Sequence, residues 1–240
     1  MDREVKKVYD KLAKRYHEIS AYHFFNAYLE VPATLSLIKN IKNKKILDLG
    51  CGTGRHTRIL KRGGAKVWGI DISPKMIEIA KSEIKGVDFK VGSVYKLPYK
   101  SNHFDIVIAG LVIHYFKNLD KAFKEIHRVL KNNGIFIFST DNPVFVITRR
   151  MKNKPRTYRI FENYFKEGKI YSWWPTFRVR MPNYHRTFQT LIRTIIRNKF
   201  VIEDYIDAKP VNKGKKVDPK NYKIYSKIPH FCVFRVKVIK

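Results

Sequence analysis

The sequence of 240 residues predicts an α/β protein with an open parallel sheet and helices on both faces. Between residues 45 and 140, short apolar segments alternate repeatedly with segments at helical spacing. The first of these apolar segments runs directly into a turn with three glycines. Hydrophobic residues make up 44% of the chain, which is enough for the core of one elaborated domain.

The first part of the chain predicts two helices. Apolar residues recur at helical spacing over residues 3–19, which favours an amphipathic helix. A second helical segment covers residues 24–39, with a break expected near Pro32, because proline lacks the N–H group that a helix interior uses.

Strands and helices then alternate in the order typical of a parallel sheet. Ser73 is the expected N-cap of one helix and Pro74 its first residue, while Gly63-Gly64 and residues 132–134 are expected to stop two others. We expect strands at 45–49, 66–70, 87–91, 104–109 and 134–139, and helices at 55–60, 73–82 and 119–130.

The alternation ends after Thr140. Residues 141–180 contain three prolines and many aromatic residues without clear periodicity, so we expect an irregular lid or binding loop. A helix over 185–198 and strands over 200–206 and 231–239 follow, with a solvated lysine-rich loop expected over 209–227.

The charge and composition exclude several protein classes. The net charge of +30 favours solubility and makes nucleic acid a possible partner, but it says nothing about the fold. No apolar stretch is long enough to span a membrane, and the charged first residues predict a cytoplasmic protein. Two cysteines are too few for a disulfide framework or a zinc site, so we expect no metal. The oligomeric state stays open.

The glycine-rich turn carries the chemistry. It reads Asp48-Leu49-Gly50-Cys51-Gly52-Thr53-Gly54, and glycines at alternate positions let a ligand lie against the backbone. Asp71 ends the next strand, where a carboxylate can accept the two hydroxyls of a ribose. Strand, turn, helix and acid together predict a nucleoside-containing cofactor at the carboxyl edge of the sheet.

The spacing favours S-adenosylmethionine over a nicotinamide dinucleotide. Dinucleotide sites use G-x-G-x-x-G around a pyrophosphate, whereas this turn is G-x-G-x-G. Asp48, immediately before the glycines, suits the α-ammonium group of S-adenosylmethionine better than a phosphate.

The chain resembles the class I S-adenosylmethionine-dependent methyltransferases of the small-molecule kind called type 11. Matching blocks are residues 46–54, 69–76, 97–99, 104–107 and 126–134. The resemblance implies a Rossmann-like, mostly parallel sheet of seven strands with an antiparallel last strand. It also implies that the glycine turn meets the methionine part, Asp71 the ribose and Ser93-Val94 the adenine. The family usually has an acid after the glycine at this point, and this chain has Gly92-Ser93.

These arguments define the expected site and its product, S-adenosylhomocysteine. The expected cofactor-binding residues are Tyr16, Asp48, Gly50, Cys51, Gly52, Thr53, Gly54, Asp71, Ile72, Met76, Ser93, Val94 and Leu111. We expect one domain over 1–240, consisting of N-terminal helices over the cleft (1–44), a cofactor-binding core (45–140), a substrate cap insertion (141–184), and a last helix with C-terminal strands (185–240).

Methyl transfer is an in-line displacement at an activated carbon, so it needs a general base only if the acceptor loses a proton. The candidates for such a base are His114, Asp141 and His185. His114 follows the fourth strand, a position that suits either a structural histidine or one that helps to enclose the ligand.

The segment from Arg149 to Phe200 has two interpretations. It holds nine of the sixteen arginines and many aromatic residues, so it fits either a cap over a small-molecule acceptor or a stacking platform for RNA. The expected substrate residues are Tyr22, Trp173, Trp174 and Arg186. We therefore expect a small-molecule methyltransferase, with a tRNA or rRNA methyltransferase as the alternative. A non-catalytic binding module is disfavoured by the intact glycine turn and Asp71.

Overall fold

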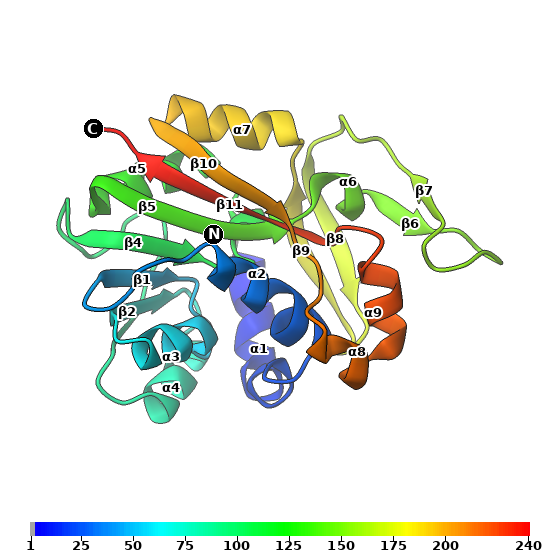
Figure 1. Ribbon diagram of the computed structural model, residues 1–240, viewed down its shortest axis with the longest axis horizontal. Helices are drawn as coiled ribbons and strands as arrows, with labels where there is room; N and C mark the ends of the chain where they lie inside the picture. The colour runs from blue at the N-terminus through cyan, green and yellow to red at the C-terminus, as the bar shows by residue number, and fades with distance from the viewer. Residues whose placement is uncertain (1–2) are drawn as a thin grey trace.

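The computed structural model describes residues 3–240; Met1 and Asp2, part of the expected segment 1–44 and of the charged start, lie outside the described residues. Its main sheet has seven strands in the order β10-β11-β5-β4-β1-β2-β3 (Figure 1). These strands are β1 Lys45–Leu49, β2 Lys66–Asp71, β3 Asp88–Val91, β4 Phe104–Ala109, β5 Leu130–Asp141, β10 Phe200–Asp207 and β11 Phe231–Val238. β11 is antiparallel to both of its neighbours, as the sequence predicted for the last strand.

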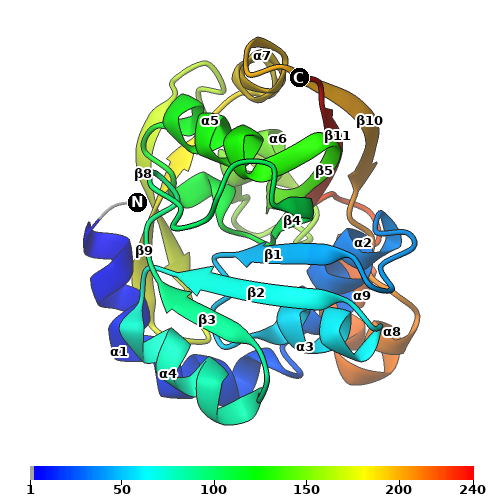
Figure 2. The same ribbon diagram turned by 90° about the vertical axis from the view of Figure 1, so that its left-hand side faces the viewer.

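Helices cover both faces of the sheet (Figure 2). On one face, residues of α1 Arg3–Ser20, α5 Leu119–Val129 and α7 Phe188–Arg197 pack with Val107 and Phe136. On the other face, residues of α2 Val31–Ser36 and α3 Arg55–Arg62 pack with Ile46 and Ile137. The remaining helices are η1 Phe25–Glu30, α4 Pro74–Glu83, η2 Ile113–Tyr115, α6 Pro143–Val146, α8 Lys213–Val217 and α9 Pro219–Tyr225. Because side chains on both strand faces are buried, these strands read as continuous apolar runs in the sequence.

The alternating core follows the predicted elements closely. Ser73 caps α4 by accepting a hydrogen bond from the Met76 amide, and Pro74 is the first residue of that helix, as expected. The segment expected over 24–39 is helical with a break near Pro32, as predicted: the π-helix η1 gives way to α2, and Pro32 lies in the first turn of α2, which ends at Ser36. β5 begins at Leu130 rather than at residue 134, so residues 132–134 lie inside this strand and not at a helix stop.

The segment after Thr140 differs most from the prediction. Instead of an irregular loop it forms two hairpins, β6 Thr148–Arg150 with β7 Arg159–Phe161 and β8 Gly168–Trp174 with β9 Val179–His185. β8 carries aromatic side chains at both exposed and half-buried positions, such as Trp173 and Trp174, and this masks the alternation that would have indicated a strand. The helix expected from residue 185 begins at Phe188, with Thr187 as its N-cap.

The lysine-rich region over 209–227 is also more ordered than predicted. It contains α8 and α9, and the Asp218 side chain caps α9 by accepting a hydrogen bond from the Asn221 amide at 2.9 Å. Pro219 is the first residue of α9, so an N-cap acid followed by proline was the signal for this helix. The packing of Tyr225 on Phe25, with ring centroids 4.9 Å apart, attaches α9 to the N-terminal region.

Candidate active site

A cavity of about 810 Å³ lies at the carboxyl edge of the sheet. β1 pairs in parallel with β2 on one side and with β4 on the other, so the residues after these three strands meet at the same edge. The glycine turn follows β1, Asp71 ends β2, and Gly110 and Leu111 follow β4; all of these segments contribute to the cavity lining. This is the position where open α/β sheets bind their ligands.

The glycines of the turn differ in what they do. Gly50 has φ of +71°, and an added Cβ would lie 2.5 Å from the Val112 side chain, so only glycine fits there. Gly50, Cys51, Gly52 and Thr53 line the cavity. Gly54 lies outside the cavity lining and packs against Ile84 instead, so its lack of a side chain serves the contact between the turn and the end of α4.

Asp48 is buried beneath the turn and does not reach the cavity lining. Its Oδ2 accepts hydrogen bonds from the Thr57 amide at 3.0 Å and from the Thr57 hydroxyl at 2.6 Å. Burial raises the pKa of this carboxyl from its ordinary value. The structure therefore shows Asp48 as an anchor for α3 that lies outside the cavity lining.

Asp71 lies between the glycine turn and the start of α4. Its Oδ2 accepts a hydrogen bond from the Gly52 amide at 3.0 Å, and its Oδ1 accepts one from the Ser73 amide at 2.8 Å. Burial raises the pKa of Asp71 to about 6. The carboxylate is thus held in place by the backbone while it borders the cavity, which suits an acceptor for ribose hydroxyls.

The other expected cofactor residues fall into three groups. Tyr16, Met76 and Leu111 line the main cavity. Ile72 and Val94 line a small adjoining pocket, which shares Gly50 and Asp71 with the cavity. Ser93 lines neither of them, because it pairs with Lys96 in an isolated β-bridge. Burial raises the pKa of the Cys51 thiol well above its ordinary value, so this cysteine is not a thiolate nucleophile.

The α1 helix and the β8–β9 hairpin meet over the cavity. The Arg15 guanidinium donates a hydrogen bond to the Thr176 carbonyl at 2.8 Å, and the rings of Tyr16 and Phe177 stack with centroids 5.6 Å apart. His23 Nε2 lies 3.2 Å from the Thr176 hydroxyl. These contacts join the first helix to the turn of the hairpin, across more than half of the chain.

Two of the three candidate bases line the cavity. Asp141 Oδ2 accepts a hydrogen bond from the Asn183 side chain at 3.2 Å, and His114 Nδ1 lies 3.4 Å from the Thr140 hydroxyl. Burial lowers the pKa of His114, and the nearby Asp141 opposes this effect. His185 lies outside the lining, because it is buried in β9 with its Nε2 2.8 Å from the Tyr164 carbonyl.

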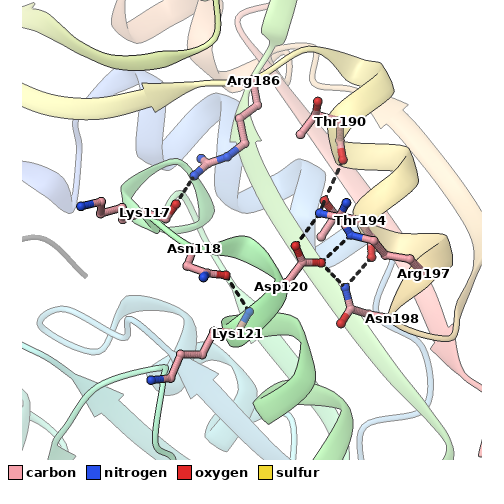
Figure 3. Close-up of polar contacts among 9 residues, drawn as sticks. All are labelled: Lys117, Asn118, Asp120, Lys121, Arg186, Thr190, Thr194, Arg197 and Asn198. Atoms are coloured by element: carbon pink, nitrogen blue, oxygen red, sulfur yellow. Dashed lines mark hydrogen bonds and ion pairs between the residues drawn. The ribbon is translucent and has the colours of Figure 1, made fainter.

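Trp173 and Trp174 line the cavity, whereas the other two expected substrate residues do not. Tyr22 is 59% exposed and lies in the turn after α1. Figure 3 shows Arg186 directed to the loop before α5, where it donates a hydrogen bond to the Lys117 carbonyl. Arg186 also donates a hydrogen bond to the Phe116 carbonyl. Arg186 therefore attaches the end of β9 to the core.

Several cavity residues were missed from the sequence. Glu30 is buried, and its Oε1 accepts hydrogen bonds from the hydroxyls of Thr34 and Ser139, both at 2.7 Å. No local motif marks such a residue, because its partners include a distant element. The residues of this missed set are His23, Glu30, Arg55, His56, Phe145, Asn183, Tyr225 and His230, whereas the lining residues Arg149, Arg156 and Arg159 belong to the arginine-rich segment noted in the sequence.

Over residues 3–240, no group of three or more His, Cys, Asp or Glu side chains is arranged to hold a metal ion. In the same part of the chain, no helix combines the length and the apolar character needed to cross a membrane.

Comparisons with known proteins agree with this geometry. The methyltransferase domain family matches residues 47–138. An uncharacterized protein of Haemophilus influenzae is 36% identical over 215 residues, which cover 82% of this chain and 84% of that protein. A demethylmenaquinone methyltransferase of Chlorobaculum parvum is 29% identical over 68% of this chain and 66% of its own length.

The crystal structure of an S-adenosylmethionine-dependent methyltransferase from Mesorhizobium loti superimposes with a TM-score of 0.74 at 25% identity, covering 87% of this chain and 97% of that one. The glycine turn, Asp71 and these likenesses together place the chain in the class I S-adenosylmethionine-dependent methyltransferase family, and its cofactor is S-adenosylmethionine.

Proposed function

We propose that this methyltransferase transfers the methyl group to a small-molecule acceptor that is enclosed between the sheet edge and the cap over residues 141–184. One observation carries the proposal: a single cavity joins Gly52 and Asp71 at one end to the aromatic residues Trp173 and Trp174. Its volume of about 810 Å³ lies within the range of small-molecule sites, roughly 300–1,000 Å³.

In this proposal the cofactor lies along the glycine turn. Asp71 accepts hydrogen bonds from the ribose hydroxyls, the amides of the turn border the methionine part, and the adenine lies beyond Asp71, on the side of Ile72 and Val94. Bound S-adenosylmethionine supplies a methyl group on an already activated sulfonium. The protein aligns the acceptor and excludes water, and the contacts of Arg15 and Tyr16 with the β8–β9 hairpin support the exclusion of water.

His114 and Asp141 are the proposed proton acceptors when the acceptor group must lose a proton. His114 is buried beside the cavity with a lowered pKa, which keeps its imidazole neutral near pH 7 and able to take a proton. Asp141 lies close enough to oppose this lowering, and it stabilises the imidazolium form once the proton has moved.

Two relatives support a small acceptor. Besides the demethylmenaquinone methyltransferase, a ubiquinone biosynthesis O-methyltransferase of Pelagibacter ubique is 39% identical over 43% of this chain and 45% of its own length. Both names describe small-molecule chemistry in those proteins.

The RNA alternative rests on the exposed face of the β6–β7 hairpin, where Tyr158 and Phe161 are 57% and 63% exposed among basic residues. The test is to incubate the enzyme and methyl-labelled S-adenosylmethionine with a metabolite extract and, separately, with total RNA. We expect label in the metabolite fraction and none in RNA. Label in RNA, lost with the Asp71→Ala variant, contradicts the small-molecule proposal.

A further inference from the structure

The half of the cavity away from the glycine turn is built from arginines and aromatic rings. These residues come from α6, the β6–β7 hairpin and the C-terminal segment, and all of them line the cavity. We call them the arginine–aromatic subsite: Phe145, Arg149, Arg156, Arg159, Tyr225 and His230.

Arg159 is held in place before any ligand arrives. Its guanidinium carbon lies 4.2 Å from the centroid of the Phe145 ring. Its Nε donates to the Thr148 hydroxyl, and its Nη2 donates to the Thr148 carbonyl at 2.8 Å. A guanidinium has five N–H donors in a planar fork, and these two contacts use only part of it. A positioned fork of this kind matches the geometry of a carboxylate or a phosphate.

The aromatic part of the subsite is centred on His230. The His230 ring centroid lies 4.5 Å from that of Phe145 and 5.1 Å from that of Tyr225, and both contacts are edge to face. His230 Nδ1 is buried and has no hydrogen-bond partner among the described residues. The rings offer stacking area for a flat apolar body, and the free nitrogen offers one polar contact to it.

The charges of the subsite do not balance. Burial lowers the pKa of the Arg159 guanidinium, and burial lowers the pKa of His230 to about 4, so His230 is neutral near pH 7. The cavity lining holds three carboxylates, of which Glu30 and Asp71 accept hydrogen bonds from neighbouring hydroxyls and amides and Asp141 accepts one from Asn183. No carboxylate belongs to the subsite with its three arginines, and the exposed Glu162 lies 3.6 Å from Arg149. An anionic group on the ligand would offset this excess of positive charge.

We infer that the methyl acceptor carries an acidic oxyanion, a carboxylate or a phosphate, on a flat apolar body, and that the arginine–aromatic subsite binds it through Arg156 and Arg159. The inference rests on the proposed small-molecule function and adds the chemical class of the acceptor. The same arrangement places the apolar body between the rings and the cofactor end of the cavity, beside His114 and Asp141.

The test compares two probes that differ in charge: 2-naphthoate and its uncharged amide, 2-naphthamide. Both are titrated into the enzyme saturated with S-adenosylhomocysteine, with calorimetry or the fluorescence of the cavity residues Trp173 and Trp174 as the signal. We expect naphthoate to bind at least tenfold more tightly than naphthamide. We expect Arg159→Gln and Arg156→Gln each to weaken naphthoate binding roughly tenfold and to leave naphthamide binding unchanged.

Arg150→Gln is the matched control, because Arg150 adjoins Arg149 on β6 but does not line the cavity. It is expected to change neither affinity. If Arg159→Gln disturbs the hairpin, Arg156→Gln carries the test alone, since the Arg156 side chain is exposed. A third probe, 2-naphthyl phosphate, assigns the oxyanion: tighter binding than naphthoate indicates a phosphate, and weaker binding indicates a carboxylate.

Equal affinities for naphthoate and naphthamide, no binding of either, or equal losses in the Arg150→Gln control would overturn the inference. Labelling of a metabolite together with any of these results leaves the small-molecule function standing and removes only the acidic acceptor. Labelling of RNA instead overturns both.

Discussion

The hydroxyl of Tyr9 donates a hydrogen bond to the hydroxyl of Tyr115 at 3.0 Å, and this contact joins α1 to the segment that follows β4. Both residues line the cavity, and the Tyr115 side chain is almost completely buried. The rings meet edge to face with centroids 5.7 Å apart. The first helix is therefore part of the wall of the active site.

Breaking this contact should destabilise the protein measurably. Tyr9→Phe removes the hydroxyl that donates to Tyr115, and the buried Tyr115 hydroxyl then lacks this hydrogen bond. We therefore expect the free energy of unfolding to fall by about 1 kcal/mol. A denaturant-unfolding cycle with Tyr115→Phe should show a coupling of similar size. Tyr158→Phe, at a 57% exposed tyrosine, should change stability by less than about 0.5 kcal/mol. If the stability losses of Tyr9→Phe and Tyr115→Phe simply add in the double variant, the prediction is contradicted.

Asp71 is predicted to be essential for cofactor binding. In the proposed site, Asp71→Ala removes the carboxylate that accepts hydrogen bonds from the ribose hydroxyls, so the affinity for S-adenosylmethionine should fall about a hundredfold or more, with the fold retained. Calorimetry measures the affinity and circular dichroism the fold. Asp88→Ala, at an exposed acid at the start of β3, is the control. If Asp71→Ala leaves the affinity for S-adenosylmethionine unchanged, the assignment of the ribose site is wrong.

Cofactor affinity should depend on pH through the same carboxyl. The pKa of Asp71 is raised to about 6, and in the proposed site it is the ionised form that accepts the hydrogen bonds of both ribose hydroxyls. Affinity should therefore be constant above about pH 7 and fall towards tenfold per pH unit below about pH 6. Dissociation constants between pH 5 and 8 provide the measurement. An equally steep loss in Asp71→Asn would show that another group titrates.

His114 is predicted to act in the chemical step. With the acceptor identified by labelling, His114→Asn should lower the single-turnover rate about a hundredfold while the affinity for S-adenosylmethionine stays within a factor of about three. Because burial lowers the pKa of His114, the wild-type rate should be constant near neutral pH and fall only on acidification, when the imidazole is protonated. His127→Asn, on α5, is the control. A rate unaffected by His114→Asn means that no base is needed at this position.

An ion pair outside the site links α5 to α7. Figure 3 shows the Arg197 guanidinium on both oxygens of Asp120, at 2.5 Å each, with Asn198 donating to Asp120 Oδ1 at 2.8 Å. Because the pair is partly exposed, Arg197→Ala should cost about 0.5–1 kcal/mol of stability at low salt and less in concentrated salt, which screens the pair.

The same pair predicts a pH effect. Burial raises the pKa of Asp120, but the hydrogen bonds from Arg197 and Asn198 outweigh this, so the pKa is lowered overall. The stabilisation is then present above the unfolded pKa, about 4, and is lost as the pH falls through the folded one. The stability gap between the wild type and Asp120→Asn, measured by urea unfolding, should close below about pH 4. A gap independent of pH contradicts the assignment.

Local sequence signals predicted the core of the fold because each one depends on neighbouring residues. The Ser73-Pro74 cap, the glycine turn and the apolar strands are all short-range features, and each was found at the expected place. The predictions over 141–180 and 209–227 were wrong because short strands and helices with exposed aromatic or lysine side chains lack a clear period.

The sequence by itself determined the family, the cofactor and the cofactor edge of the cavity. The parallel pairing of β1 with β2 brings Asp71 beside the glycine turn. These two strands follow each other in the sequence, so their pairing could be predicted from it. The opposite half of the cavity was decided only by tertiary packing. Phe145, Arg159 and His230 come from separate segments and meet through ring contacts and a cation–π contact that no spacing in the sequence reveals. Packing also keeps Asp48, His185 and Arg186 out of the cavity lining, because each side chain makes a hydrogen bond elsewhere in the fold.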